Sequence, residues 1–142
     1  MLLYKHFILA IIILFTTIAL SQNEVAKKEY SGAVIEFEKS EHDFGTVEAG
    51  KIVEHIFKFT NIGNDTLYIK KVDGGWGCTA ALLSSKVIAP GGTGEIKVSF
   101  DTKNRRNKNK KSIKVYSNDS VKRLRKLTIK AFVNKKTKNN KL

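Results

Sequence analysis

The sequence predicts an all-β protein: an immunoglobulin-like two-sheet β-sandwich of about seven short strands, preceded by a signal peptide. From Val34 onward, apolar residues recur with a period of two, and turn-forming residues separate the alternating stretches. The chain has 142 residues, 42% of them hydrophobic, which is enough for one buried core. A single cysteine excludes an internal disulfide and a cysteine-based structural zinc site, so burial alone must hold the two sheets together.

Residues 1–21 have the pattern of a signal peptide. Lys5 places a positive charge near the start, an apolar run covers residues 7–20, and small residues end at Ser21, ahead of an expected cleavage before Gln22. The alternative is a membrane anchor, but the run is shorter than the roughly 20 residues that a spanning helix needs. We therefore expect export, to the periplasm or the cell surface. The expected organisation is a signal peptide, a linker, the sandwich domain and a disordered basic tail, at residues 1–21, 22–33, 34–134 and 135–142.

The expected strands follow in order, with turns at residues 61–65 and 90–92. In residues 95–100, alternate apolar side chains are expected to point inward, and residues 112–117 and 127–133 repeat this pattern. Residues 51–60 carry apolar side chains on both parities, which predicts a strand covered on both faces. Residues 79–85 are expected to hold a helical turn at most. The seven strands are expected at residues 34–39, 51–60, 66–72, 86–89, 95–100, 112–117 and 127–133.

Positive charge is concentrated in the last third of the chain. The net charge is +13, and residues 103–142 hold sixteen Lys and Arg against Asp119 alone. Residues 103–111 are expected to form a long loop and residues 122–126 the next connection, at opposite ends of a hairpin. Such clusters suit either a solvated surface or contact with an anionic lipid or glycan. Nucleic acid is not expected, because aromatic residues do not interleave with the cations and export argues against it.

Six segments carry a family resemblance when they are taken in order: residues 42–47, 57–63, 67–69, 74–79, 88–91 and 115–118. Together they resemble the "domain of unknown function 1573", an immunoglobulin-like family of exported Bacteroidota proteins related to PapD-like and ASH-type sandwiches. The resemblance covers about Val34 to Val133 and implies no catalytic activity. The family usually has Cys-Gly-Cys-Thr where this chain has Trp76-Gly77-Cys78-Thr79, which puts in doubt any redox or metal role of paired thiols.

Two residues of this loop are candidates in their own right. Cys78 is either a buried structural residue or a thiolate that could hold copper with His42 and His55. Trp76 either closes one end of the core or contacts a partner. Catalytic residues, metal ligands and cofactors are not expected. The candidate interaction residues are Trp76, Cys78, Lys103, Arg105, Arg106, Lys108, Lys110, Lys111, Lys122, Arg123, Arg125 and Lys126.

These observations predict a non-catalytic, exported binding or structural module, an accessory component of a cell-envelope assembly with a protein partner. Pairing at an open strand edge is one physical route to such a partner. One alternative is a binder of anionic envelope polymers or lipids through the basic loops, and another is a small redox or copper-handling protein using Cys78. Thr66 and Ser120 each follow an aspartate and precede an aliphatic residue, a pattern that also suits O-glycosylation.

Overall fold

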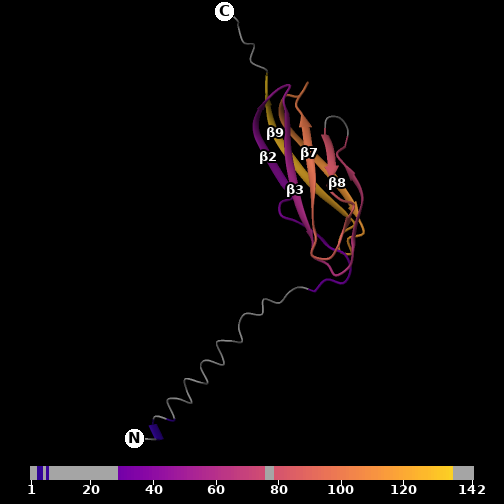
Figure 1. Ribbon diagram of the computed structural model, residues 1–142. Helices are drawn as coiled ribbons and strands as arrows, with labels where there is room; N and C mark the ends of the chain where they lie inside the picture. The colour runs from indigo at the N-terminus through magenta and orange to yellow at the C-terminus, as the bar shows by residue number, and fades with distance from the viewer. Residues whose placement is uncertain (1–2, 5, 7–28, 76–78, 136–142) are drawn as a thin grey trace, which may run out of the picture.

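The computed structural model describes residues 3–4, 6, 29–75 and 79–135 (Figure 1). The predicted cleavage site, the loop residues Trp76 and Cys78, and all of the predicted tail after Lys135 lie outside the described residues. Leu3, Tyr4 and His6 have helical conformation. Among the described residues, no helix is long and apolar enough to cross a membrane.

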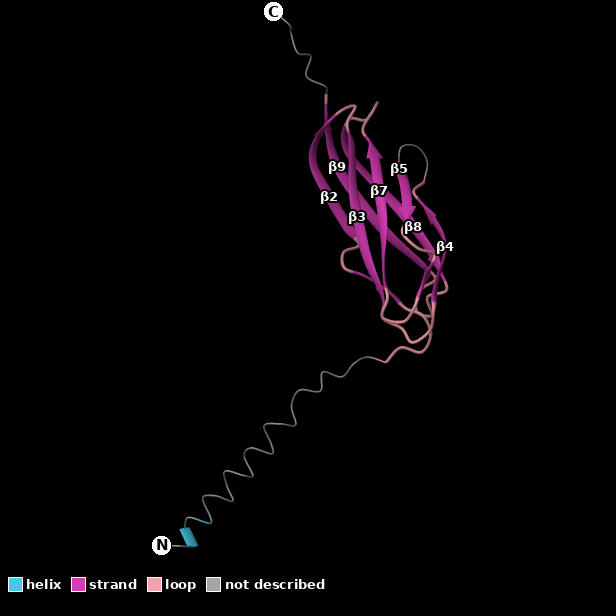
Figure 2. Cartoon of the chain, viewed as in Figure 1, coloured by secondary structure: helices cyan, strands magenta, loops and turns pink. Residues whose placement is uncertain are grey.

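Residues 29–75 and 79–135 form two packed β-sheets, as predicted (Figure 2). The four-stranded sheet has the order β1-β3-β7-β5 and the five-stranded sheet the order β2-β9-β8-β4-β6. The chain enters the sandwich at one end and leaves it, after β9, at the other (Figure 1). The strands are β1 (Ile35–Phe37), β2 (Glu41–Glu48), β3 (Ile52–Asn61), β4 (Leu67–Asp73), β5 (Thr79–Leu83), β6 (Val87–Ile88), β7 (Thr93–Asp101), β8 (Asn107–Ser117) and β9 (Leu124–Asn134).

The alternating strands build the core between the sheets. Phe57 and Phe59 of β3 lie opposite Ile96 and Gly94 of β7, and the apolar residues among them are at most 1% exposed. The five-stranded sheet contributes the alternate apolar residues of β8 and β9. Each side chain buried in this way contributes roughly 1.5–3 kcal/mol. The predicted inward faces of residues 95–100, 112–117 and 127–133 are therefore confirmed.

The structure has nine strands in the described segments, two more than predicted. β2 pairs in parallel with β9, and the chain reaches it by crossing from one sheet to the other after β1. The register of β2 shifts between Asp43 and Thr46, where Gly45 has a φ of 67°. Such a bulge moves later side chains to the other parity, so the alternation that marks a strand is broken here. β5 is the second addition, and the predicted helical turn in residues 79–85 is wrong.

The basic segment before β8 and the faces of β3 both differ from what the sequence predicts. The long basic loop is shorter than predicted, because β8 begins at Asn107 and its first residues pair with β9. β3 is covered on one face only: Ile52 and Ile56 are 66% and 44% exposed on the outer face of the four-stranded sheet. Because both side chains are exposed, the two isoleucines belong to an outer surface and not to a second core.

Buried polar side chains anchor the segment that leads into β1. Asn61 is fully buried, and its Oδ1 accepts hydrogen bonds from the amides of Val34 and Gly63 at 3.3 and 3.1 Å. Its Nδ2 donates to the carbonyls of Asp65 and Ile88 at 2.8 and 3.0 Å. All four hydrogen-bonding positions of this amide are thus occupied, so the side chain is structural.

Asp119 makes a second such anchor from the connection between β8 and β9. It is fully buried, and its Oδ2 accepts from the Ile35 amide at 3.3 Å and from Nε and Nη2 of Arg125 at 2.9 and 2.7 Å. Its Oδ1 accepts from the amides of Val121 and Lys122 at 2.8 and 3.1 Å. Burial alone raises the pKa of this carboxyl, but the hydrogen bonds outweigh it and hold the pKa below the ordinary 3.8.

Candidate functional site

The margins of the two sheets differ in how well they are protected. β1 and β6 are edge strands of three and two residues, too short to pair extensively with another chain. β2 is an edge strand of eight residues, but it carries three outward acidic residues and the bulge at Gly45. Charges, bulges and short length are the usual protections of an edge. β5 has none of these features.

β5 is a five-residue edge strand with the sequence Thr-Ala-Ala-Leu-Leu. Beyond its end, the Ser84 amide donates to the Glu95 carbonyl of β7 at 2.9 Å, with Leu83 opposite Ile96 in register. Because hydrogen-bonding direction alternates along a strand, the backbone groups of Leu82 also face β7. Those of Ala81 and Leu83 therefore face the open edge, where no described strand pairs with them. Figure 2 shows β5 at the margin opposite β2.

Side chains near this edge add apolar surface on the outer face of the four-stranded sheet. Leu82 is 66% exposed and lies opposite Lys97 of β7, which in turn lies opposite Ile56 of β3. Lys97 forms an ion pair with Glu54 at 2.8 Å, so its charge is matched locally. A strand added to β5 would therefore meet free backbone groups and an exposed leucine.

The structure separates the predicted basic residues into three groups. Lys103, Arg105 and Arg106 lie in the turn between β7 and β8, whereas Lys122 and Arg123 lie in the turn between β8 and β9. Because Asn107 pairs with Val133 and Tyr116 with Leu124, these turns are at opposite ends of the sandwich, as predicted. The turns do not form one patch. The remaining predicted cations, Lys108, Lys110, Lys111, Arg125 and Lys126, are on strands β8 and β9.

Arg125, one of the predicted interaction residues, has a structural role. Its guanidinium forms the bidentate contact with the buried Asp119 carboxylate, and its own side chain is 28% exposed.

The two predicted glycan acceptors differ in exposure. Ser120 is exposed, and its amide donates to the Ala33 carbonyl at 2.8 Å. Thr66, the other predicted acceptor of a glycan, is half-buried. Ala33 itself is buried, so the packed core includes a residue assigned to the linker from the sequence.

The two histidines of the copper hypothesis, His42 and His55, do lie together, but as a stacked pair. His42 of β2 and His55 of β3 stack between the sheets, with ring centroids 3.7 Å apart and planes 6° from parallel. The edges of Phe44 and Phe57 flank the stack at 4.6 and 4.7 Å. Burial lowers the pKa of His55, and the positive charges of His42 and Lys39 lower it further. The arrangement therefore favours a neutral His55 at pH 7.

The histidine stack does not resemble a metal centre. Imidazole lone pairs lie in the ring plane, so those of two parallel rings run side by side and do not converge on one point. Residues 29–75 and 79–135 contain no group of three or more histidine, cysteine or carboxylate side chains that could hold a metal ion. Cys78, the third predicted copper ligand, lies outside the described residues.

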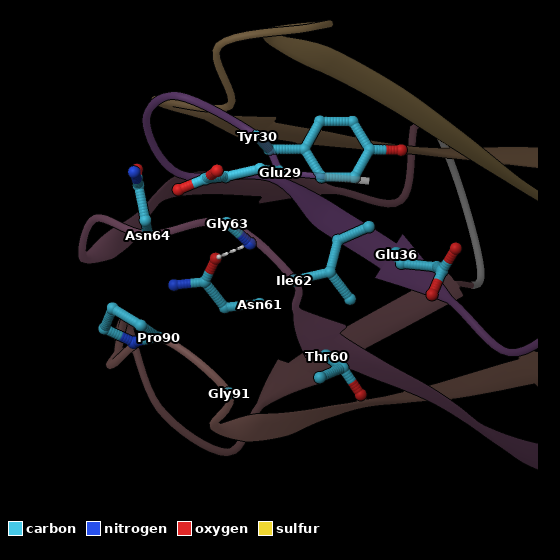
Figure 3. A pocket seen from close by; sticks show the side chains of 10 residues that line it. All are labelled: Glu29, Tyr30, Glu36, Thr60, Asn61, Ile62, Gly63, Asn64, Pro90 and Gly91. Atoms are coloured by element: carbon cyan, nitrogen blue, oxygen red, sulfur yellow. Dashed lines mark hydrogen bonds between the residues drawn. The ribbon is translucent and has the colours of Figure 1, made fainter. Parts of the chain in front are cut away.

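A hollow of about 910 Å³ lies where the N-terminal segment meets the turns at the end of the four-stranded sheet. In Figure 3, Glu29 and Tyr30 stand on one side of it and Pro90 and Gly91 on the other. Glu36 and Thr60, which are register partners on β1 and β3, form part of its wall. Sequence patterns gave no signal for this hollow, because its walls come from segments that are distant in the chain.

The chain matches one protein family and is similar in fold to several solved structures. A family model described as "Protein of unknown function (DUF1573)" matches residues 35–133. The fold is similar to a protein of unknown function from Porphyromonas gingivalis W83, at 21% identity and a TM-score of 0.65. The match covers 78% of this chain and 51% of that one, so this chain spans about half the length of that protein. No curated protein matches the chain.

Two further solved structures share the fold. The seventh PapD-like domain of human CEP192, an ASH domain, has 14% identity and a TM-score of 0.55 over 72% of this chain and 86% of that chain. The secreted serine protease VesC from Vibrio cholerae has 17% identity and a TM-score of 0.54 over 70% of this chain, but only 23% of its own. At such identities the likeness is one of fold, and the fold is a PapD-like β-sandwich.

Proposed function

The chain belongs to the DUF1573 family of proteins of unknown function, and we propose that it is a non-catalytic binding module that accepts a partner strand at the open edge of β5. The observation that carries this proposal is the contrast between the edges. β5 leaves the backbone groups of Ala81 and Leu83 unpaired by any described strand, whereas β2 is protected by acidic residues and a bulge. An added strand gains its affinity from these backbone hydrogen bonds and its specificity from alternate side-chain contacts.

The chemistry of the edge defines the kind of partner. The strand is uncharged, and its outward-facing Leu82 is 66% exposed. A matching segment is therefore extended, has no proline within the paired residues, and carries apolar side chains toward Leu82. We further propose that the chain is exported by its N-terminal signal peptide and that the partner is a protein of the cell envelope. The apolar run at residues 7–20 supports export.

The backbone N–H of Ala81 can be removed by substitution to test strand addition at β5. Ala81→Pro removes one outward N–H, while the alternating bonds of its neighbours to β7 remain, and proline is tolerated on an edge strand in that orientation. Ala81→Gly is the matched control, because it alters the same position and keeps the N–H. The tagged protein is used to capture partners from a native envelope extract with washing at high salt.

The proposal predicts that a protein captured by the native chain and by Ala81→Gly is lost with Ala81→Pro. Urea unfolding of both variants checks that the sandwich is intact. Equal capture by the proline variant would exclude this edge as the binding route. Capture of lipids or glycans alone, released by high salt, would contradict a protein partner.

A further inference from the structure

The pairing of β8 with β9 sets lysines directly opposite one another. Lys110 lies opposite Lys130, and Lys114 lies opposite Lys126. Ile113, between the two positions on β8, is fully buried, so the lysines point away from the core onto the outer surface of the five-stranded sheet. We call these four residues the lysine face. It lies on the sheet opposite the one that contains β5, and it differs from the basic turns at the two ends.

Such an arrangement works against the fold unless an anion accompanies it. Like charges directly opposite in an antiparallel ladder are destabilising. Glu41 of β2 relieves one pair by forming an ion pair with Lys130. Lys114 lies opposite the carboxylate-bearing Asp73 of β4 in register, and that carboxylate forms its ion pair with Lys71, at 3.2 Å.

Lys110 and Lys126, the other members of the two pairs, have no carboxylate beside them in the described segments. Lys110 and Lys126 are both exposed, and neither forms an ion pair with any residue of the described segments. A ligand anion that lies between the two strands would therefore relieve a repulsion that the protein itself leaves in place. The face thus complements negative charge.

The groups around the lysines indicate what kind of polyanion fits. Ser112 and Thr128 lie opposite each other between the two lysine pairs, so hydroxyl groups separate the charges. Phe132, 40% exposed, stands beyond Lys130 on the same face, opposite Lys108. Hydroxyl side chains hydrogen-bond to sugar hydroxyls, and an exposed aromatic ring packs against the apolar face of a sugar. A membrane surface would favour several protruding apolar side chains among the cations, whereas the groups between these lysines are hydroxyls.

We propose that the lysine face binds a linear acidic polysaccharide, whose carboxylate or sulfate groups contact the four lysines while its hydroxyls contact Ser112 and Thr128. The chain would run along the β8–β9 ladder, since the cations form rows in that direction. This inference is independent of strand addition at β5, because it involves the opposite sheet and different residues.

The test measures binding of the protein to polygalacturonate and dextran sulfate at low salt, with neutral dextran as the reference. Lys110→Ser combined with Lys126→Ser removes one lysine from each opposed pair, and neither of these two lies opposite or pairs with a carboxylate of the described segments. Lys103→Ser combined with Arg106→Ser is the matched control, because it removes the same charge from the turn between β7 and β8. Glu41→Gln releases Lys130 from its carboxylate partner.

We expect an affinity about tenfold weaker for the Lys110/Lys126 variant, little change for the control, and tighter binding for Glu41→Gln. Binding of the native chain should weaken steeply with salt, because each contacted anion releases counterions. The Lys110/Lys126 variant should also unfold at a higher urea concentration than the native chain at low salt, because the cross-strand repulsion is gone. A lower affinity in that variant therefore cannot come from a damaged fold.

Several results would overturn the proposal. Equal loss of binding in the turn control would show attraction by net charge alone. Tighter binding to phosphatidylglycerol vesicles than to either polysaccharide would assign the face to a lipid surface, and tighter binding to a single-stranded oligonucleotide would assign it to nucleic acid. A Lys110/Lys126 variant that is less stable than the native chain would refute the repulsion on which the inference depends.

Discussion

Replacing Asp119 with alanine tests the anchor that joins the start of β1 to the connection between β8 and β9. The carboxylate is fully buried and accepts hydrogen bonds from three backbone amides and from the Arg125 guanidinium. Alanine leaves these donors without their acceptor, at a cost of about 1–3 kcal/mol for each buried donor that stays unpaired. Water reaches the part-exposed donors, because Arg125 is 28% exposed. We therefore expect a loss of about 4 kcal/mol, within the range for breaking a buried ion pair.

Urea unfolding followed by far-ultraviolet circular dichroism measures this loss as a change in the free energy of unfolding. For a domain of this size, 4 kcal/mol corresponds to a melting temperature lower by about 15–30 °C. Asp101→Ala is the control, because Asp101, the last residue of β7, accepts a hydrogen bond from the Lys103 amide at 2.8 Å but is only half-buried. Its loss should stay below about 1 kcal/mol. Equal effects of the two substitutions would refute the assignment of Asp119 as an anchor.

The same aspartate makes a pH prediction of defined sign. Its pKa in the folded protein lies below the ordinary 3.8, so the folded state binds this proton less readily than the unfolded state does. The stability it contributes is present above pH 3.8 and is lost as the pH falls through the lower, folded value. Asp119→Ala should remove this acid-dependent part of the unfolding free energy, and an unchanged dependence below pH 3.8 would contradict the hydrogen bonds described.

Further predictions concern the core and the histidine stack. Because the pKa of His55 is lowered from 6.5, stability should fall as the pH drops below about 6.5 until the folded value is passed, and His55→Gln should flatten that slope in urea titrations. A slope that persists in His55→Gln would assign it to other groups. Gly94→Ala should cost about 1–3 kcal/mol, since its Cβ would stand 2.3 Å from Cζ of Phe59 and displace that ring. A melting temperature unchanged in Gly94→Ala would show that the ring moves freely.

The fold class was predictable because much of the core belongs to strands with unbroken alternation. In β7, Ile96, Val98 and Phe100 are buried while the residues between them are not, which is the pattern that the sequence displays. β2 was missed because the bulge at Gly45 interrupts its alternation. β5 was missed because Thr-Ala-Ala-Leu-Leu contains no charged residue, and its apolar residues do not alternate with polar ones.

The candidate sites depended on pairing between distant residues, which local patterns do not contain. The early part of β8 has no apolar residue before Ile113, so its lysines looked like a loop until the register with β9 placed them on a strand. Likewise, His42 and His55 stack only because β2 joins the five-stranded sheet next to β9 and faces β3 across the core. The separation of the basic turns was predictable, because it follows from a hairpin alone.

Amide hydrogen exchange on the captured complex tests strand addition at β5 most directly. The amides of Ala81 and Leu83 face the open edge, whereas the Leu82 amide is already directed toward β7. We predict that partner binding slows exchange at Ala81 and Leu83 strongly and leaves Leu82 nearly unchanged. If Ala81 and Leu83 exchange as fast in the complex as in the free protein, the partner binds elsewhere and the proposed function is wrong.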